Sequence, residues 1–159
     1  GEVPDFAGRD IREGEPDRRV IRVGRKLADQ PLFRTFAERA IALARYPGKP
    51  SELCTEIIDN IAAPNLAVFL GVEDKRPRAL FVGMLPASRA MMAPQALLVY
   101  SRKPELSRMI GEAVKVWLEQ AGYDRIIGMN LNHKDEPFLR TFRHVGKPRV
   151  LGSLVEVRI

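Results

Sequence analysis

The stretch QALLVYSRKPELSRMIGEAVKVWLEQAG, residues 95–122, constrains the fold more than any other part of the sequence. Its apolar first half, residues 95–100, predicts a central β-strand. Pro104 suits the first turn of a helix, and the apolar residues after it recur at helical spacing until Gly122, which favours a helix end. A strand that leads straight into a long amphipathic helix indicates a mixed α/β domain, and helix starts of this kind often bind phosphate.

Similar patterns divide the rest of the chain into helices and strands. Helices are expected at 31–46, 51–63 and 135–146, and strands at 19–23, 66–73, 78–85, 123–131 and 148–159. The resulting order, β, α, α, β, β, β, α, β, α, β, predicts one mixed α/β domain over residues 19–159. Residues 1–18 are rich in charged residues and predict an extended or partly disordered arm.

The net charge of +6 admits an anionic partner without requiring one. No long block of Lys and Arg is present, and aromatic residues make up only 7% of the chain, so the sequence does not predict a nucleic-acid-binding protein. No apolar run reaches the roughly 18 residues that cross a bilayer, and the polar start shows no secretion signal. Neither a membrane protein nor a secreted one is predicted.

Cys54 is the chain's one cysteine, so no internal disulfide is possible and a cytoplasmic location is expected. It lies on the apolar face of a predicted helix, where a small buried hydrophobic residue is the favoured interpretation. One cysteine and two histidines do not build a zinc site, and no metal is predicted.

The succession of elements, with a long helix after the central strand and a short helix ended by Gly146, resembles the GCN5-related N-acetyltransferase (GNAT) superfamily over residues 19–159. The resemblance implies a mixed, mostly antiparallel sheet flanked by helices, the α/β (α+β) class. It implies that two parallel strands splay apart and hold acetyl-CoA for transfer of the acetyl group to an amine. It also implies that the pyrophosphate lies at the start of the long helix, where backbone N–H groups and the macrodipole favour an anion.

The family's motif at that helix start is Gln or Arg, two residues, Gly, one residue, then Gly or Ala. When RMIGEAV is aligned with the motif, Gly111 takes its second small position and Met109 replaces its first glycine. In a second register Arg102 takes the first position, and Glu105 and Ser107 replace the glycines. Both registers depart from the motif, which indicates a divergent member.

Positive charge near the helix start offers a second way to hold phosphate groups, through side chains rather than backbone. Arg102, Lys103 and Arg108 are candidates, and a merely solvated basic helix start is the alternative. Asn132, or its neighbour Asn130, is a candidate for contact with a pantetheine amide. The cofactor-binding prediction is Arg102, Lys103, Arg108, Gly111 and Asn132.

The family's general acid is a tyrosine four residues before the glycine of the short helix. Phe142 stands at that position and has no proton to donate. Residues 78–100 contain no Asp or Glu that could act as a base, and Tyr100 is a hydrogen-bonding side chain at the end of the central strand. His133 lies in a strand-to-helix loop, where sites are common. The catalytic candidates are therefore Tyr100 and His133, whereas His144 is expected at a helix end or on the surface.

Two classes of function follow from the resemblance. The first is an acetyl-CoA-dependent N-acetyltransferase that acts on an amine which the sequence does not specify. The second is a catalytically inactive domain with the same fold that serves as a structural or interaction part, such as a component of a larger assembly or a phage particle. Met91 and Met92, in a predicted loop, are candidates for contact with a protein partner.

Overall fold

The computed structural model describes residues 14–90, 93–128, 136–149, 151 and 157–158, with only the backbone of 136–138. Its strands are β1 (Arg18–Arg22), β2 (Leu66–Glu73), β3 (Arg76–Met84), β4 (Gln95–Ser101) and β5 (Ile127–Gly128). Its helices are α1 (Arg25–Ala28), α2 (Pro31–Leu43), α3 (Pro50–Asp59), α4 (Pro104–Gln120) and α5 (Glu136–Arg143). The predicted order is confirmed up to α5, and α1 is an additional short helix.

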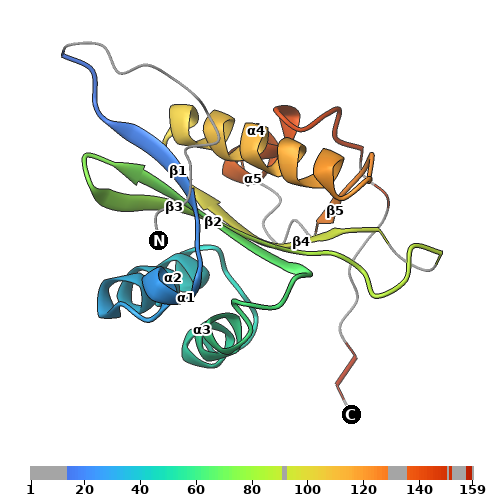
Figure 1. Cartoon of the computed structure of the whole chain (residues 1–159), viewed down its shortest axis with the longest axis horizontal. Coiled ribbons are helices and arrows are strands. Elements are labelled where there is room, and N and C mark those ends of the chain that lie inside the picture. The colour runs from blue at the N-terminus through green and yellow to red at the C-terminus, as the bar shows by residue number, and fades with distance from the viewer. Residues whose placement is uncertain (1–13, 91–92, 129–135, 150, 152–156, 159) are drawn as a thin grey trace.

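The described strands form one sheet in the order β1-β2-β3-β4-β5 (Figure 1). The first four strands are antiparallel neighbours, and β4 pairs with β5 in parallel. Asp74 and Lys75 make the turn of the β2–β3 hairpin with positive φ angles of 49° and 65°. The predicted mixed, mostly antiparallel sheet is confirmed.

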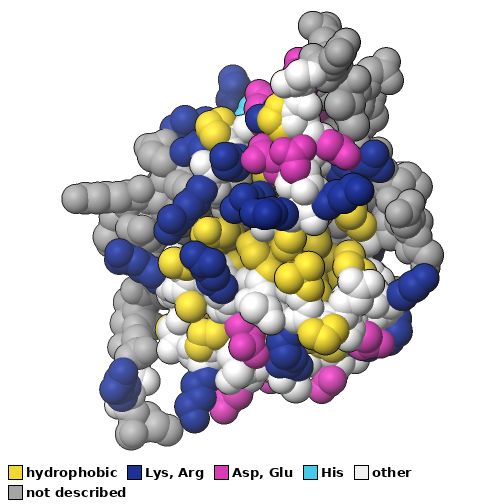
Figure 2. Space-filling model, turned by 90° about the vertical axis from the view of Figure 1, so that its left-hand side faces the viewer, with side chains coloured by type: hydrophobic (Ala, Val, Ile, Leu, Met, Phe, Trp, Pro, Cys, Tyr) yellow, Lys and Arg dark blue, Asp and Glu magenta, His cyan; other side chains and the backbone are white. Residues whose placement is uncertain are grey.

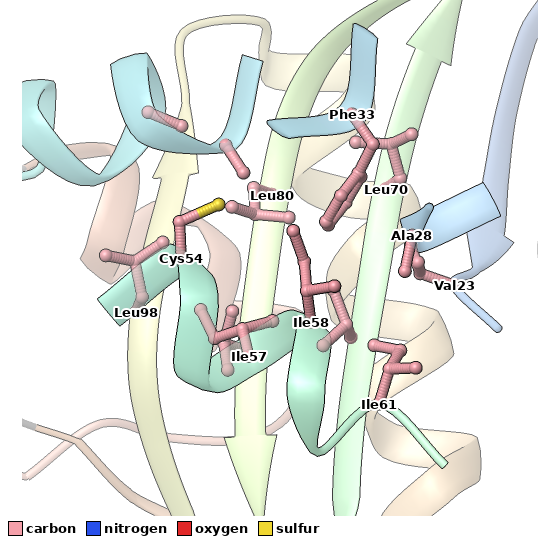
Figure 3. Close-up of a cluster of buried hydrophobic side chains, with 14 of the residues drawn as sticks. Val23, Ala28, Phe33, Cys54, Ile57, Ile58, Ile61, Leu70, Leu80 and Leu98 are labelled. Carbon is pink, nitrogen blue, oxygen red and sulfur yellow. The ribbon is translucent and has the colours of Figure 1, made fainter. Parts of the chain in front are cut away.

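Helices cover both faces of the sheet, with α1, α2 and α3 on one face and α4 and α5 on the other (Figure 1). Side chains alternate along each strand, so Leu70, Leu80 and Leu98 pack under α2 and α3 (Figure 3). Cys54 of α3 is fully buried in this cluster, and burial raises the pKa of its thiol. The prediction that Cys54 is a small buried hydrophobic residue is confirmed.

The opposite face of the sheet packs against α4 through an aromatic cluster. The Trp117 ring lies edge-on to the rings of Phe69 and Phe81, at centroid distances of 6.5 and 6.1 Å. Phe69 and Phe81 are themselves register partners on β2 and β3. The cluster fixes α4 across the middle of the sheet and therefore fixes the position of its N-terminus.

Several predicted boundaries differ from the structure. The helix predicted at 31–46 ends at Leu43, because the chain turns at Arg45, which has a φ of 59°. The strand predicted at 123–131 is Ile127–Gly128 within the described residues, and 129–131 lie outside them. Of the strand predicted at 148–159, residues 148, 149, 151, 157 and 158 are described, and these form no strand.

The predicted arm, the predicted methionine loop and the absence of a predicted membrane span can each be compared with the described residues. Asp17, within the predicted arm, bonds through its carbonyl to the Asp74 N–H at 2.7 Å, so the β1–β2 ladder extends to it. Residues 1–13 of the predicted arm, and Met91 and Met92, lie outside the described residues. No described helix has both the length and the apolar character that crossing a bilayer requires.

Candidate functional site

The junction between β4 and α4 lies where the sequence predicted a phosphate-binding turn. The helix begins at Pro104, and its N-cap residue Lys103 makes no capping hydrogen bond through its side chain. Of the two motif registers, the one that begins at Arg102 therefore coincides with the helix start. Met109 lies further along α4 and is fully buried against the sheet, so it does not occupy that start.

Gly111 lies two turns into α4, away from the helix start. A Cβ at this position would lie 2.6 Å from the Thr141 carbonyl oxygen and 2.6 Å from the His144 Cβ. The absence of a side chain therefore lets α4 and α5 approach closely. The structure separates Gly111 from Arg102 and Lys103 and gives this glycine a packing role, and its predicted place at the pyrophosphate stays a prediction.

Two buried serines hold the β4–α4 junction in place. The Ser107 hydroxyl donates to the Ser101 Oγ at 2.8 Å, and the Ser101 hydroxyl donates to the Lys103 carbonyl at 3.2 Å. Both serines are fully buried. The Glu73 carboxylate, only 12% exposed, adds ion pairs to Lys103 Nζ at 3.7 Å and to Arg18 Nε at 2.9 Å. The loop that carries Arg102 and Lys103 is thus fixed by neighbours on both sides.

We expect Ser101→Ala to lower the free energy of unfolding by about 1–3 kcal/mol, because the Ser107 hydroxyl loses its buried acceptor. The double variant Ser101→Ala/Ser107→Ala should lose less than the sum of the two single variants, since no hydroxyl is then left unpaired. Urea denaturation of the four proteins measures this coupling. Additive losses would contradict the hydrogen-bonded pair.

Among the described residues, β4 and β5 pair in parallel at the first two residues of β4. The register pairs are Gln95 with Ile127 and Ala96 with Gly128. Leu97 to Ser101 lie beyond these pairs, and residues 129–135, which follow β5, lie outside the described residues. The part of β4 beyond these pairs leads directly to the start of α4.

Arg108 differs from Arg102 in having its charge compensated by two carboxylates. Its guanidinium lies 3.1 Å from Glu105 and 2.6 Å from Glu112. Partial burial lowers the pKa of Arg108, but the hydrogen bonds to the two carboxylates outweigh it, so the net shift is upward. Arg108 in turn compensates the Glu105 carboxylate, the one acidic side chain of the first turn.

Tyr100 points to the face of the sheet that carries α2, where it lines a cavity of about 250 Å³. Its ring lies edge-on to that of Phe36 at 6.2 Å, and the Arg102 guanidinium lies 5.9 Å from its centroid. The cavity is lined by Phe36, Arg39, Pro77, Arg78, Tyr100, Arg102 and Lys103. We call it the basic pocket. The molecular face in Figure 2 accordingly shows Lys and Arg side chains beside a hydrophobic area.

The remaining site predictions differ in what the structure says of them. Asn132 and His133 lie outside the described residues, so their roles stay predictions. Phe142 is 8% exposed and packs in the core beneath α4. His144 is exposed just after α5. Within the described residues, no cluster of three or more His, Cys, Asp or Glu side chains is arranged to hold a metal ion.

Sequence reasoning missed Arg39 and Arg78 as site residues. Phe36 and Arg39 lie three apart on α2, which places them on one helix face. Arg78 lies near the start of β3, beside the end of β4. The helical spacing was visible in the sequence, but only the tertiary packing shows that these side chains meet Tyr100.

No protein-family model matches the sequence, and no curated protein matches it. Solved structures do match its fold. One described as a probable acetyltransferase has a TM-score of 0.66 and 10% identity, over 89% of this chain and 97% of that one. A predicted acetyltransferase from Clostridium acetobutylicum, solved with acetyl-CoA, has a TM-score of 0.64 and 10% identity, over 89% of this chain and 96% of that one.

A third similar structure is AAC(6')-Iy in complex with the bisubstrate analogue CoA-S-monomethyl-acetylneamine. Its TM-score is 0.64 and its identity 12%, over 90% of this chain and 99% of that one. All three likenesses span nearly the whole of both chains. The chain therefore has the fold of the GNAT acetyltransferases, as its order of elements predicted.

Proposed function

We propose that this protein transfers the acetyl group of acetyl-CoA to an amine. The observation that carries the proposal is the β4–α4 junction of this fold. There the strand leads into a helix start without a side-chain cap, with Arg102 and Lys103 immediately before it. Structures of the same fold have been solved with acetyl-CoA and with a CoA-based bisubstrate analogue. The lone buried Cys54 suits the reducing cytoplasm, where we place this activity.

The residues at the helix start suit the phosphates of acetyl-CoA. Arg102 and Lys103 supply positive charge at the N-terminus of α4, whose macrodipole also favours an anion. Glu105 would oppose a phosphate there, but Arg108 compensates its charge. Gly111 is not part of this proposed site, because it packs against α5. Asn132 and His133 are retained as candidate contacts to the cofactor and to the reacting amine.

Acetyl-CoA supplies a thioester whose carbonyl carbon the amine attacks: a C–N bond forms, the C–S bond breaks, CoA leaves as the thiolate, and the proton lost by the amine passes to solvent. The chain's own contribution is mainly to position the two reactants, which is worth several kcal/mol of the barrier. Phe142 gives no proton to the departing sulfur, and a thiol with an ordinary pKa of about 8.5 is a tolerable leaving group without one. Tyr100 lies on the α2 side of β4, where we place the acceptor.

We expect acetyl-CoA at 100 times its Kd to stabilise the protein by about 2.7 kcal/mol. That corresponds to a rise in Tm of about 5–10 °C for a chain of this length. In Arg102→Ala/Lys103→Ala the Kd for acetyl-CoA should rise about tenfold or more, because two charge-assisted contacts are lost. A thermal-shift titration measures both effects.

Lys115→Ala is the matched control, since it removes a positive charge from an exposed position of α4 and should leave the Kd unchanged. If millimolar acetyl-CoA leaves the Tm of the wild-type protein unchanged, the proposal is wrong. The inactive structural or interaction domain would then be the better description.

A further inference from the structure

The basic pocket collects positive charge of which described carboxylates compensate only that of Lys103. Four of its seven lining residues are cationic and none is acidic. Lys103 has an ion pair, to Glu73 at 3.7 Å. Arg39, Arg78 and Arg102 have no ion pair with a described carboxylate, in contrast to Arg25 with Asp29 and Arg34 with Glu38. Like charges that converge on one cavity repel one another, and a bound anion relieves that repulsion.

The cations that line the pocket come from three different parts of the fold, and two aromatic side chains lie beside them. Arg39 comes from α2, Arg78 from β3, and Arg102 and Lys103 from the β4–α4 loop. The rings of Phe36 and Tyr100 supply the apolar part of the wall. A ligand that fits such a pocket has a negatively charged group and an apolar or aromatic part beside it.

The pocket and the proposed acetyl-CoA site share Arg102 and Lys103 at the end of β4, whereas Arg39 and Arg78 belong to the pocket alone. Tyr100 points toward α2, whereas its neighbour Ser101 points toward α4 and bonds to Ser107. An acceptor amine must reach the thioester from a side that the donor does not fill. The α2 side of β4 meets that condition, and the basic pocket is the described cavity there.

We propose that the basic pocket binds an acceptor amine through a carboxylate or phosphate group which that acceptor carries. This inference rests on the proposed acetyl transfer and names the class of its substrate: an acidic amine, such as an amino acid derivative or a phosphorylated amine. It also excludes polycationic amines as acceptors. Aminoglycosides, the substrates named for one enzyme of the same fold, are polycations, and four positive side chains would repel them.

Phenyl phosphate is a suitable probe, because it joins an aromatic ring to a dianion and contains no amine that could react. We expect it to bind the full-length protein in isothermal titration calorimetry, more weakly as salt is added. Arg39→Ala/Arg78→Ala should raise its Kd at least about tenfold, because two charge-assisted contacts are lost. Lys115→Ala, with a similar loss of exposed charge, should leave it unchanged.

Acetyl-CoA titrated into the same variants separates the two possible sources of the anion. If the pocket binds the acceptor, Arg39→Ala/Arg78→Ala keeps the wild-type Kd for acetyl-CoA. If that Kd rises in parallel with the one for phenyl phosphate, the pocket binds the phosphates of acetyl-CoA, and the inference is overturned. It is equally overturned if phenyl phosphate does not bind the wild-type protein, or binds the double variant equally well.

A turnover assay with matched acceptors completes the test. Acetylation of tyrosine and phosphotyrosine should exceed that of tyramine, which lacks the acidic group, and kanamycin should be the poorest acceptor. A preference for kanamycin or tyramine would overturn the inference while leaving acetyl transfer intact. Binding of phenyl phosphate without any binding of acetyl-CoA would instead refute the proposed function, and the acceptor assignment with it.

Discussion

Gly111→Leu is expected to destabilise the protein by about 3 kcal/mol, even though leucine is a much better helix former than glycine. Helix propensity alone would predict a gain of somewhat under 1 kcal/mol at this position inside α4. The new side chain would meet the Thr141 carbonyl oxygen and the His144 Cβ, each 2.6 Å from its Cβ. Backbone of α5 cannot yield as a flexible side chain does, so the two helices must separate.

Thermal denaturation measures the effect, and a fall in Tm of about 6–12 °C is expected. Gly146→Leu is the matched control, because nothing lies within 4 Å of the Cβ built there. That control should change stability by no more than about 0.5 kcal/mol. A Gly111→Leu protein as stable as the wild type would show that α5 does not pack on α4 as described.

Phe81→Ala is expected to cost about 3–5 kcal/mol, the largest loss that we predict for a single substitution. Phe81 is fully buried in the centre of β3, between Phe69 and Trp117. Its removal opens a cavity beneath α4 and removes two aromatic contacts, which the neighbouring side chains cannot fully replace. The position of the α4 N-terminus depends on the same cluster, so acetyl-CoA binding should weaken as well.

Trp117 is the only tryptophan of the chain, so its fluorescence reports directly on this cluster. Urea denaturation followed at the tryptophan emission should show a lower midpoint and a red-shifted native spectrum for Phe81→Ala. Leu32→Ala, at a position 61% exposed, is the comparison and should lie within about 0.5 kcal/mol of the wild type. A loss below about 1 kcal/mol for Phe81→Ala would contradict the described packing.

Periodicity in the sequence predicted the helices and strands whose apolar side chains pack between the sheet and the helices. The helix that starts at Pro104 and the strand at 66–73 were both correct, because their patterns run over many residues. The short helix α1 was missed, since four residues are too few to show a period. Prediction was therefore best where burial dictates the pattern, and weakest where the chain only connects elements.

Residues of the candidate site were harder to predict than the elements, for a different physical reason. Glycine inside a helix permits close approach of a ligand or of another helix, and the local sequence does not say which. For Gly111 the neighbour is the backbone of α5, a contact between segments far apart along the chain. Arg39 and Arg78 escaped notice for the same reason, because only tertiary structure brings them to Tyr100.

The outer strand β1 has a consequence for self-association. Within the described residues it pairs only with β2, and three of its five residues are arginines, Arg18, Arg19 and Arg22. If two molecules joined edge to edge in an antiparallel pair centred on Val20, Arg18 of one copy would face Arg22 of the other. Electrostatic repulsion between these arginines, which the Arg18–Glu73 ion pair reduces, opposes edge-to-edge association, so concentrated solutions of the protein should resist fibril growth at this strand.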